Sequence, residues 1–298
     1  MKTAVLVMAY GSPTTLDDVK AYYTDIRRGR PPSAEALADL TGRYRSIGGT
    51  SQLTDITHAQ AGALEHLLEE VAPDSYNVYV GMKHWHPYIA EGVANIVADG
   101  LEDVVGLVLA PHFSSKSIGE YQTKVETAGH EVNLHMVSSW YDEPGFIALV
   151  ASNIAASIEG WHDHRVFFTA HSLPQRILEE GDPYADQLKE SAELIAKEAD
   201  IDDWEVAWQS ASHTGEPWIG PDILERLDAF RSEGGERALI APIGFVSDHL
   251  EILYDVDIEC VERAAQLGLD LRRINSPNDD PRFIQALANV VLRSSPSR

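Results

Sequence analysis

The chain has 298 residues, 44% of them hydrophobic, which is enough for one large α/β domain or two smaller ones. Its 47 Asp and Glu residues outnumber its 23 Lys and Arg residues, and the formal charge of −24 argues against binding to nucleic acid or to an anionic membrane surface. No segment reaches the roughly 20 continuous apolar residues of a membrane span, and a single cysteine, Cys260, excludes an internal disulfide. We therefore expect a cytoplasmic α/β protein.

Short apolar, β-branched segments alternate with longer amphipathic segments along the chain. The predicted strands are residues 4–9, 78–82, 104–110, 134–137, 166–170, 204–208, 239–246 and 269–274. The predicted helices between them include residues 54–71, 87–99, 144–158, 186–199, 221–232 and 249–265. Nearly continuous apolar strands separated by helices indicate parallel sheets with both faces covered.

An internal similarity suggests two related halves, residues 1–160 and 161–298. LVMAYGSP (6–13) resembles FFTAHSLP (167–174), and LVLAPHFSS (107–115) resembles ALIAPIGFVS (238–247). We expect a four-stranded parallel sheet in each half and a cleft between the halves, because ligands of such sheets bind beyond the carboxyl ends of the strands. The polar residues at or just past predicted strand ends are Tyr10, His84, His112, His171, His213 and Glu251.

The first half carries an insertion, residues 26–53, which has Pro-Pro and Gly-Gly breaks around one short helical pattern. Long insertions beside a cleft tend to be functional. In a strongly acidic chain, a local arginine cluster can orient carboxylates or phosphates bidentately; a solvated loop that pairs with nearby acids is the alternative. The arginines of the insertion are Arg27, Arg28, Arg30, Arg43 and Arg45.

Three carboxylates, Glu251, Asp255 and Glu259, recur at every fourth position just past the predicted strand 239–246. On an α-helix they fall within about 80° of one another. A solvated outer face is the usual origin of such a pattern. Glu251, however, lies where the cleft is expected, and oxygen ligands one turn apart suit weak, transient coordination of a divalent cation along a path.

His171 follows the apolar strand 166–170, where an imidazole can accept protons near neutral pH. The adjacent Ser172 suggests a Ser–His hydrolase, but the chain has no G-x-S-x-G turn, and neighbouring residues of a strand point to opposite faces. The G-x-G-x-x-G and G-x-x-x-x-G-K-[ST] motifs of dinucleotide and phosphate sites are also absent from the sequence.

Several longer motifs, spread in order over nearly the whole chain, resemble those of one family. They are YYTDIRRGRPP (22–32), RYRSIGGTSQL (43–53), GMKHWHPYI (81–89), TAHSLPQRI (169–177), GDPYADQL (181–188), WQSASHTGEPWIGPD (208–222) and PIGFVSDHLEILYDVDIEC (242–260). The chain resembles the ferrochelatases, which insert ferrous iron into a porphyrin, and among them the Gram-positive-type coproporphyrin ferrochelatases. The resemblance implies two Rossmann-like halves, each with a four-stranded parallel sheet flanked by helices, around a porphyrin cleft.

The resemblance also implies roles for individual residues. His171 and Glu251 would be the catalytic pair and ligands of the metal, and Asp255 and Glu259 would continue a metal path. Tyr10 would contact the opposite porphyrin face and act as an axial ligand of the product iron. The positions that match propionate-binding residues of the family are Arg27, Arg43, Ser51 and Tyr121. Gln52 departs from the family pattern, in which many members have proline.

The implied reaction is the insertion of Fe²⁺ into coproporphyrin III, which gives coproheme III in haem biosynthesis. The alternatives are a protoporphyrin IX ferrochelatase, a cobalt or nickel chelatase of the same superfamily, and a non-catalytic haem or tetrapyrrole carrier. We expect Fe²⁺ as a substrate and no permanently bound cofactor, and one cysteine is too few for an iron–sulfur cluster. We also expect a monomer with no nucleic-acid partner and no membrane span, in transient contact with the next enzyme of the haem pathway.

Overall fold

The computed structural model describes residues 2–128, 132–211 and 215–296. It contains two four-stranded sheets, with strand orders β2-β1-β3-β4 and β6-β5-β7-β8. Every neighbouring pair of strands is parallel, so the predicted fold class is confirmed. The strands are β1 (Thr3–Ala9), β2 (Tyr76–Met82), β3 (Asp103–Val108), β4 (Asn133–Met136), β5 (His164–His171), β6 (Trp204–Gln209), β7 (Arg237–Ala241) and β8 (Asp270–Arg273).

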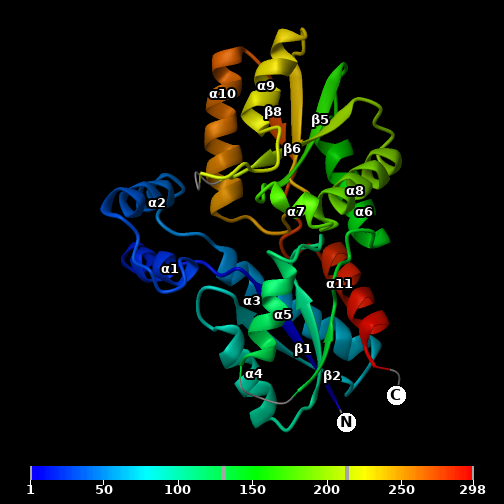
Figure 1. The fold of residues 1–298 in the computed structure, drawn as a ribbon. Coiled ribbons are helices and arrows are strands. Elements are labelled where there is room, and N and C mark those ends of the chain that lie inside the picture. The colour runs from blue at the N-terminus through cyan, green and yellow to red at the C-terminus, as the bar shows by residue number, and fades with distance from the viewer. Residues whose placement is uncertain (1, 129–131, 212–214, 297–298) are drawn as a thin grey trace.

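Helices connect the strands and cover the sheets (Figure 1). The α-helices are α1 (Val19–Ile26), α2 (Ala34–Ser46), α3 (Leu53–Val71), α4 (Ile89–Ala98), α5 (Ile118–Glu126), α6 (Pro144–Ser157), α7 (Arg176–Glu179), α8 (Tyr184–Glu198), α9 (Ile223–Ser232), α10 (Val261–Leu267) and α11 (Pro281–Ser294). A short 3₁₀ helix, η1 (Leu16–Asp18), precedes α1. Among the described residues, we find no helix with the length and apolar character needed to cross a membrane.

β1 and β5 lie inside their sheets, each between two partners, and this explains their composition. All seven residues of β1 are buried, and Val166–Ala170 of β5 are buried as well. A strand that is covered on both faces has no solvated side, so it reads as an uninterrupted apolar segment. Tyr10 and His171, at the carboxyl ends of these two strands, therefore stand at corresponding places in the two sheets.

The segment that follows β7 differs from its prediction in two ways. The strand ends at Ala241 instead of residue 246, because Pro242 has no backbone N–H for a ladder and begins a turn. The expected α-helix 249–265 begins as a π-helix, η2 (Glu251–Cys260), and becomes α-helical only in α10. π-Helices are rare and occur frequently at functional sites.

The insertion forms a small helical pair with its own apolar contacts. α1 and α2 project to one side of the N-terminal half (Figure 1). Val19, Tyr22 and Tyr44 form their buried centre. Leu250, which directly precedes η2, packs against the same centre, so the insertion contacts the acidic helix of the other half.

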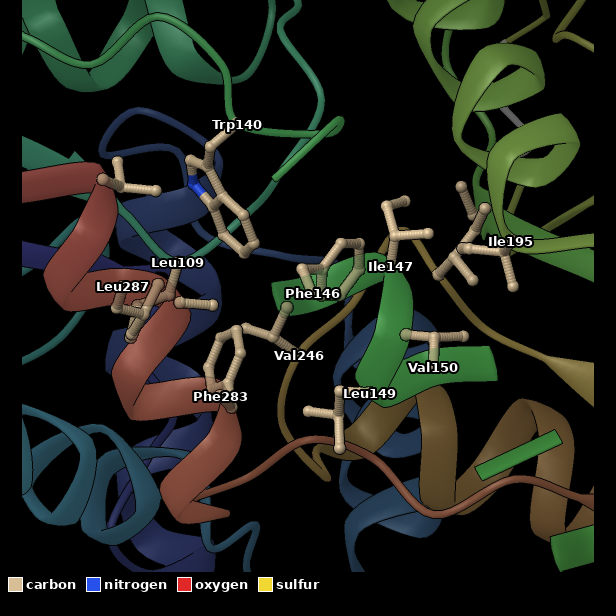
Figure 2. Close-up of a cluster of buried hydrophobic side chains, with 14 of the residues drawn as sticks. Leu109, Trp140, Phe146, Ile147, Leu149, Val150, Ile195, Val246, Phe283 and Leu287 are labelled. Atoms are coloured by element: carbon tan, nitrogen blue, oxygen red, sulfur yellow. The ribbon is translucent and has the colours of Figure 1, made fainter. Parts of the chain in front are cut away.

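One helix from each half of the chain packs against the other half. α6 precedes β5 in the chain but packs against α8 and β7 of the C-terminal half. α11, the last helix, packs against α3 and β3 of the N-terminal half and against α6. Figure 2 shows the apolar side chains that join these elements, among them Phe146 of α6 and Phe283 of α11. One continuous hydrophobic cluster therefore runs through both halves.

Candidate active site

His171 and Glu251 lie side by side. His171 is the last residue of β5, and Glu251 is the first residue of η2. The His171 Nε2 and Glu251 Oε1 atoms are 3.7 Å apart, and the side chains are 32% and 30% exposed. A second imidazole, that of His249, places its Nε2 atom 3.8 Å from Glu251 Oε2. A carboxylate flanked by two imidazoles at a strand end can attract a cation and exchange protons.

The neighbouring charges set the ionisation of Glu251. Burial alone would raise the pKa of this carboxyl, but the charges of His171, His249 and Arg43 outweigh burial and lower the pKa to about 2. Burial by itself would also lower the pKa of His249, but its hydrogen bond and charge interaction with Glu251 reverse this and raise the pKa. Glu251 is therefore an anion at neutral pH.

Two close contacts bring the start of η2 to the end of β5. The loop after β7 passes directly over β5, where a Cβ atom on Gly244 would lie 2.4 Å from Ala170 Cβ, so only glycine fits. Gln209, the register partner of His171 on β6, is buried, and its Nε2 atom donates to the Glu251 carbonyl at 3.0 Å. The backbone of Glu251 is thus held beside His171 by contacts with the neighbouring strands β5 and β6.

Asp255, the second carboxylate of the predicted path, is buried and contacts two polar side chains. Ser210 Oγ donates to Asp255 Oδ2, and Arg43 Nη1 lies 3.4 Å from Asp255 Oδ1. Burial, and then the negative charge of Glu251, raise the pKa of Asp255 to about 6, although Ser210 and Arg43 lower it. The pKa of Glu259 is also raised, mainly by burial. The acids of η2 therefore differ in proton affinity from one turn to the next.

Arg43 comes from α2 of the insertion, but its guanidinium reaches across to η2. Its Cζ atom lies 4.8 Å from the centroid of the Tyr254 ring, and its Nε atom lies 3.3 Å from Asp39 Oδ2. In this structure the predicted propionate-binding arginine thus pairs with acids of the chain, above all with the buried Asp255.

Tyr10 stands at the end of β1 and is 39% exposed. Its ring centroid lies 4.6 Å from that of His84, and Lys83 Nζ lies 5.7 Å from the centroid of the Tyr10 ring. The pKa of the Tyr10 phenol is raised, first by burial and then by the charge of Glu251. The Tyr10 phenol is therefore protonated at neutral pH.

The other predicted substrate-binding residues lie around the insertion and β1. Tyr121 is buried, and Lys83 Nζ lies 5.1 Å from the centroid of its ring. Arg27 is exposed, and its Cζ atom lies 5.7 Å from the centroid of the Tyr23 ring. Ser51 is buried, and its hydroxyl accepts from the Leu53 N–H at 3.2 Å, at the start of α3.

Two other histidines at predicted strand ends, His84 and His112, have polar partners in the structure. His84 Nδ1 lies 2.7 Å from Asp25 Oδ2, and burial lowers the pKa of His84 to about 4. His112 is buried between the halves, where its Nε2 atom lies 2.9 Å from Ser191 Oγ. His213 lies outside the described residues.

The predicted porphyrin cleft between the halves stays a prediction. Two surface hollows in the described part of the chain lie elsewhere. One, of about 310 Å³, is lined by residues 14–17 and 48–50 beside the insertion. The other, of about 360 Å³, lies beside α8 and β6 and is lined by Glu193 and Trp204 among others.

Three residues of the site were not identified from the sequence: His249, Gln209 and Ser210. His249 could have been identified, since it lies two residues before Glu251 and shortly after a predicted strand. Gln209 and Ser210 follow the apolar segment 204–208, at the same place relative to their strand as His171. Their position just past the carboxyl end of a predicted strand is the feature from which they could have been predicted as site residues.

Solved structures of two chelatases share the fold. CbiX, described as the terminal enzyme for biosynthesis of siroheme in denitrifying bacteria, superposes with a TM-score of 0.59 at 14% identity, over 98% of this chain and all of its own. The sirohydrochlorin chelatase SirB from Bacillus subtilis subspecies spizizenii, in complex with cobalt, gives a TM-score of 0.60 at 12% identity, over 99% of this chain and 96% of SirB.

Sequence comparison extends to the whole chain. A protein of Halalkalibacterium halodurans described as "Coproporphyrin III ferrochelatase" is 45% identical over 98% of this chain and 97% of its own. A protein of Herpetosiphon aurantiacus described as "Ferrochelatase" is 48% identical over 97% of this chain and 98% of its own. The family model described as Ferrochelatase matches residues 2–295. The resemblance seen in the motifs is confirmed, and the chain belongs to the ferrochelatase family, whose enzymes insert iron into a porphyrin.

Proposed function

We propose that this protein inserts Fe²⁺ into coproporphyrin III and so forms coproheme III. The observation that carries the proposal is the His171–Glu251 pair, in which an imidazole and an anionic carboxylate lie 3.7 Å apart and partly exposed at the end of β5. Relatives at 45% and 44% identity described as coproporphyrin III ferrochelatases support this choice of substrate.

The chemistry requires that two pyrrole N–H protons leave as the metal enters. We assign His171 and Glu251 to this exchange, because an imidazole can accept a proton near neutral pH and an anionic carboxylate attracts the cation. His249, on the other side of Glu251, offers a further place for a proton. Asp255 and Glu259 deliver Fe²⁺ along η2, and Tyr10 contacts the opposite face of the porphyrin as an axial ligand of the product iron.

Coproporphyrin III carries four propionates, whereas protoporphyrin IX carries two. A water-soluble tetra-anion suits a site bordered by exposed arginines, and Arg27, Arg28 and Arg30 are all exposed. We assign propionate binding to Arg27, Arg43, Ser51 and Tyr121. For Arg43 a propionate would compete with Asp255 for the guanidinium.

An anaerobic assay tests the substrate. Absorbance changes of coproporphyrin III and protoporphyrin IX are followed with Fe²⁺, and those of sirohydrochlorin with Co²⁺. We expect the largest kcat/KM for coproporphyrin III with Fe²⁺. A larger value for protoporphyrin IX would overturn the substrate assignment, and binding without turnover of any tetrapyrrole would overturn the enzymatic role.

Two substitutions test the catalytic pair. We expect His171→Ala and Glu251→Gln each to lower kcat by about 100-fold or more, because each removes a proton-exchanging or metal-attracting group from the reacting centre. Both side chains are partly exposed, so the variants should retain the wild-type circular dichroism spectrum. Near-native insertion by a folded His171→Ala variant would show that His171 is not in the reaction.

A further inference from the structure

The segment GDPYADQL, residues 181–188, has no part in the chemistry above, yet it contacts the catalytic strand. The hydroxyl of Tyr184, the first residue of α8, donates to the main-chain carbonyl of His171 at 3.0 Å. Tyr184 is only 7% exposed, and its ring centroid lies 5.6 Å from that of Trp208. A buried, well-packed tyrosine has a single place for its hydroxyl, so this bond fixes the end of β5 from the side of α8.

In the same segment, Asp182 forms hydrogen bonds with the N-terminal half of the molecule. One carboxylate oxygen, Oδ2, accepts from Ser114 Oγ at 3.0 Å and from the Ser115 N–H at 2.7 Å. The other oxygen, Oδ1, accepts from the Tyr184 N–H at 3.1 Å. A single carboxylate therefore joins the loop 112–115 of the N-terminal half to the first residue of α8.

Two further bonds strengthen this junction. Gln187 Oε1 accepts from the Phe113 N–H at 2.7 Å. The Ser191 hydroxyl donates its only proton to the Tyr141 carbonyl at 2.8 Å, so His112 Nε2, 2.9 Å away, is the donor to Ser191. The loop 112–115 is thus held at four successive residues, the first two by α8 and the last two by Asp182.

On its other side, the loop 112–115 is tied to the strand that carries Tyr10. It follows β3, the parallel neighbour of β1, and the Leu109 N–H donates to the Met8 carbonyl at 2.8 Å. A chain of bonded groups therefore runs from the end of β1, through Asp182 and Tyr184, to the end of β5.

We propose that Asp182 and Tyr184 are positioning residues, which hold His171 in place relative to the Tyr10 side of the site. Metal insertion needs both sides at a defined separation, because the flat macrocycle lies between them. Small displacements of a reacting group lower its rate strongly. This inference rests on the proposed function, since it assigns the junction a role in that reaction.

The test compares two variants that each remove one phenolic hydroxyl at the same junction. Tyr184→Phe removes the bond to His171, whereas Tyr141→Phe, the control, removes only the bond from Tyr141 Oη to Glu190 Oε2, 2.8 Å long. We expect Tyr184→Phe to lower kcat about tenfold without changing KM for porphyrin or iron, and Tyr141→Phe to leave both unchanged. Equal effects of the two variants, or an effect on KM alone, would refute the proposal.

Asp182→Asn tests the connection between the halves. Its single acceptor oxygen can serve either the Tyr184 N–H or the Ser115 N–H, but not both. Because Asp182 acts through Tyr184, we expect the double variant Asp182→Asn/Tyr184→Phe to have the same kcat as Tyr184→Phe alone. A double variant whose loss equals the product of the two single losses would show that the residues act separately.

A readout that needs no turnover separates this inference from the proposed function. The ring ¹H–¹³C signal of His171 is assigned by its loss in His171→Gln. We expect the signal to move or broaden in Tyr184→Phe and to stay in place in Tyr141→Phe. An unmoved signal in Tyr184→Phe refutes the positioning role. If the wild-type protein inserts no iron while the signal still moves, the proposed function fails and the junction stands.

Discussion

Gly244 is the residue on which the approach of the two site segments depends. The loop that carries it lies against β5 one residue before His171, with no room for a side chain. Gly62, in the middle of α3 and exposed, has no atom within 4 Å of the place where its Cβ would lie. Replacement by alanine should therefore have opposite effects on stability at the two positions.

We expect Gly244→Ala to reduce the free energy of unfolding by about 2–3 kcal/mol and to lower iron insertion as well, because the loop must move away from Ala170. Gly62→Ala, as the control, should stabilise the protein by up to about 1 kcal/mol without changing kcat. Urea denaturation and the anaerobic assay measure both quantities. Equal stability of the two variants would contradict the close contact.

Asp255 carries a pH-dependent cost to stability. Its pKa is raised from 3.8 to about 6 in the folded protein, so the folded state binds more protons than the unfolded state between these values. Stability from this residue is therefore highest at low pH and falls as the pH rises through about 6. The sign is opposite to that of Glu251, whose lowered pKa contributes stability that is lost only as the pH falls toward 2.

We expect Asp255→Asn to stabilise the protein relative to wild type near neutral pH, by up to about 3 kcal/mol, and to have little effect near pH 4. Asp39→Asn, which removes an exposed carboxylate from the same arginine, is the control. The measurement is urea denaturation at both pH values. A stabilisation that is the same at both pH values would show that folding does not raise the pKa of Asp255.

The sequence identifies single residues better than it identifies their partners. His171 and Glu251 are predictable because each follows an apolar strand, and parallel strands present their carboxyl ends at one edge. The contact of Arg43 with Asp255 joins residues 212 positions apart, and no local pattern encodes it. The difference between a free and a paired arginine is therefore visible only in the folded chain.

At the scale of elements, η2 shows how tertiary contacts override a local pattern. The spacing of its acids is equally compatible with an α-helix and with a wider turn. Several non-local side chains contact the wide turn: Gln209 at the Glu251 carbonyl, Ser210 at Asp255, and Arg273, whose guanidinium donates to both Asp257 carboxylate oxygens at 2.7 and 2.9 Å. The central strands β1 and β5, by contrast, were predicted to within two residues at each end, because a strand buried on both faces is a continuous run of apolar residues in the sequence.

We expect the double variant Asp255→Ala/Glu259→Ala to raise the half-saturating Fe²⁺ concentration about tenfold or more with a smaller change in kcat, because we propose that these acids deliver iron along η2 to His171 and Glu251. Glu262→Gln, at an exposed acid just beyond η2, is the control and should leave the iron dependence unchanged. Steady-state insertion rates measured at varied Fe²⁺ concentrations give the half-saturating concentration of each variant. An unaltered iron dependence in the double variant would show that Asp255 and Glu259 take no part in delivering iron.

At the scale of the whole molecule, the charge of −24 acts in opposite directions on the two substrates. The field of an acidic protein draws Fe²⁺ toward the surface and repels a tetra-anionic porphyrin. Salt screens both effects, since the Debye length shortens as ionic strength rises.

Raising KCl from about 0.02 to about 0.3 M should therefore raise KM for Fe²⁺ and lower KM for coproporphyrin III. Protoporphyrin IX, with two carboxylates, should show the weaker response of the two porphyrins. Shifts of both substrates in the same direction would point to a general effect of salt on the enzyme. An uncharged osmolyte at matched osmolarity provides the control.

The placement of α11 bears on how the chain folds during synthesis. Residues 281–294 complete the packing around α3 and β3, so the half that leaves the ribosome first cannot finish its core until these residues have emerged. Until then an apolar surface on α3 stays uncovered, and a chaperone that binds such surfaces has a defined place and interval in which to act.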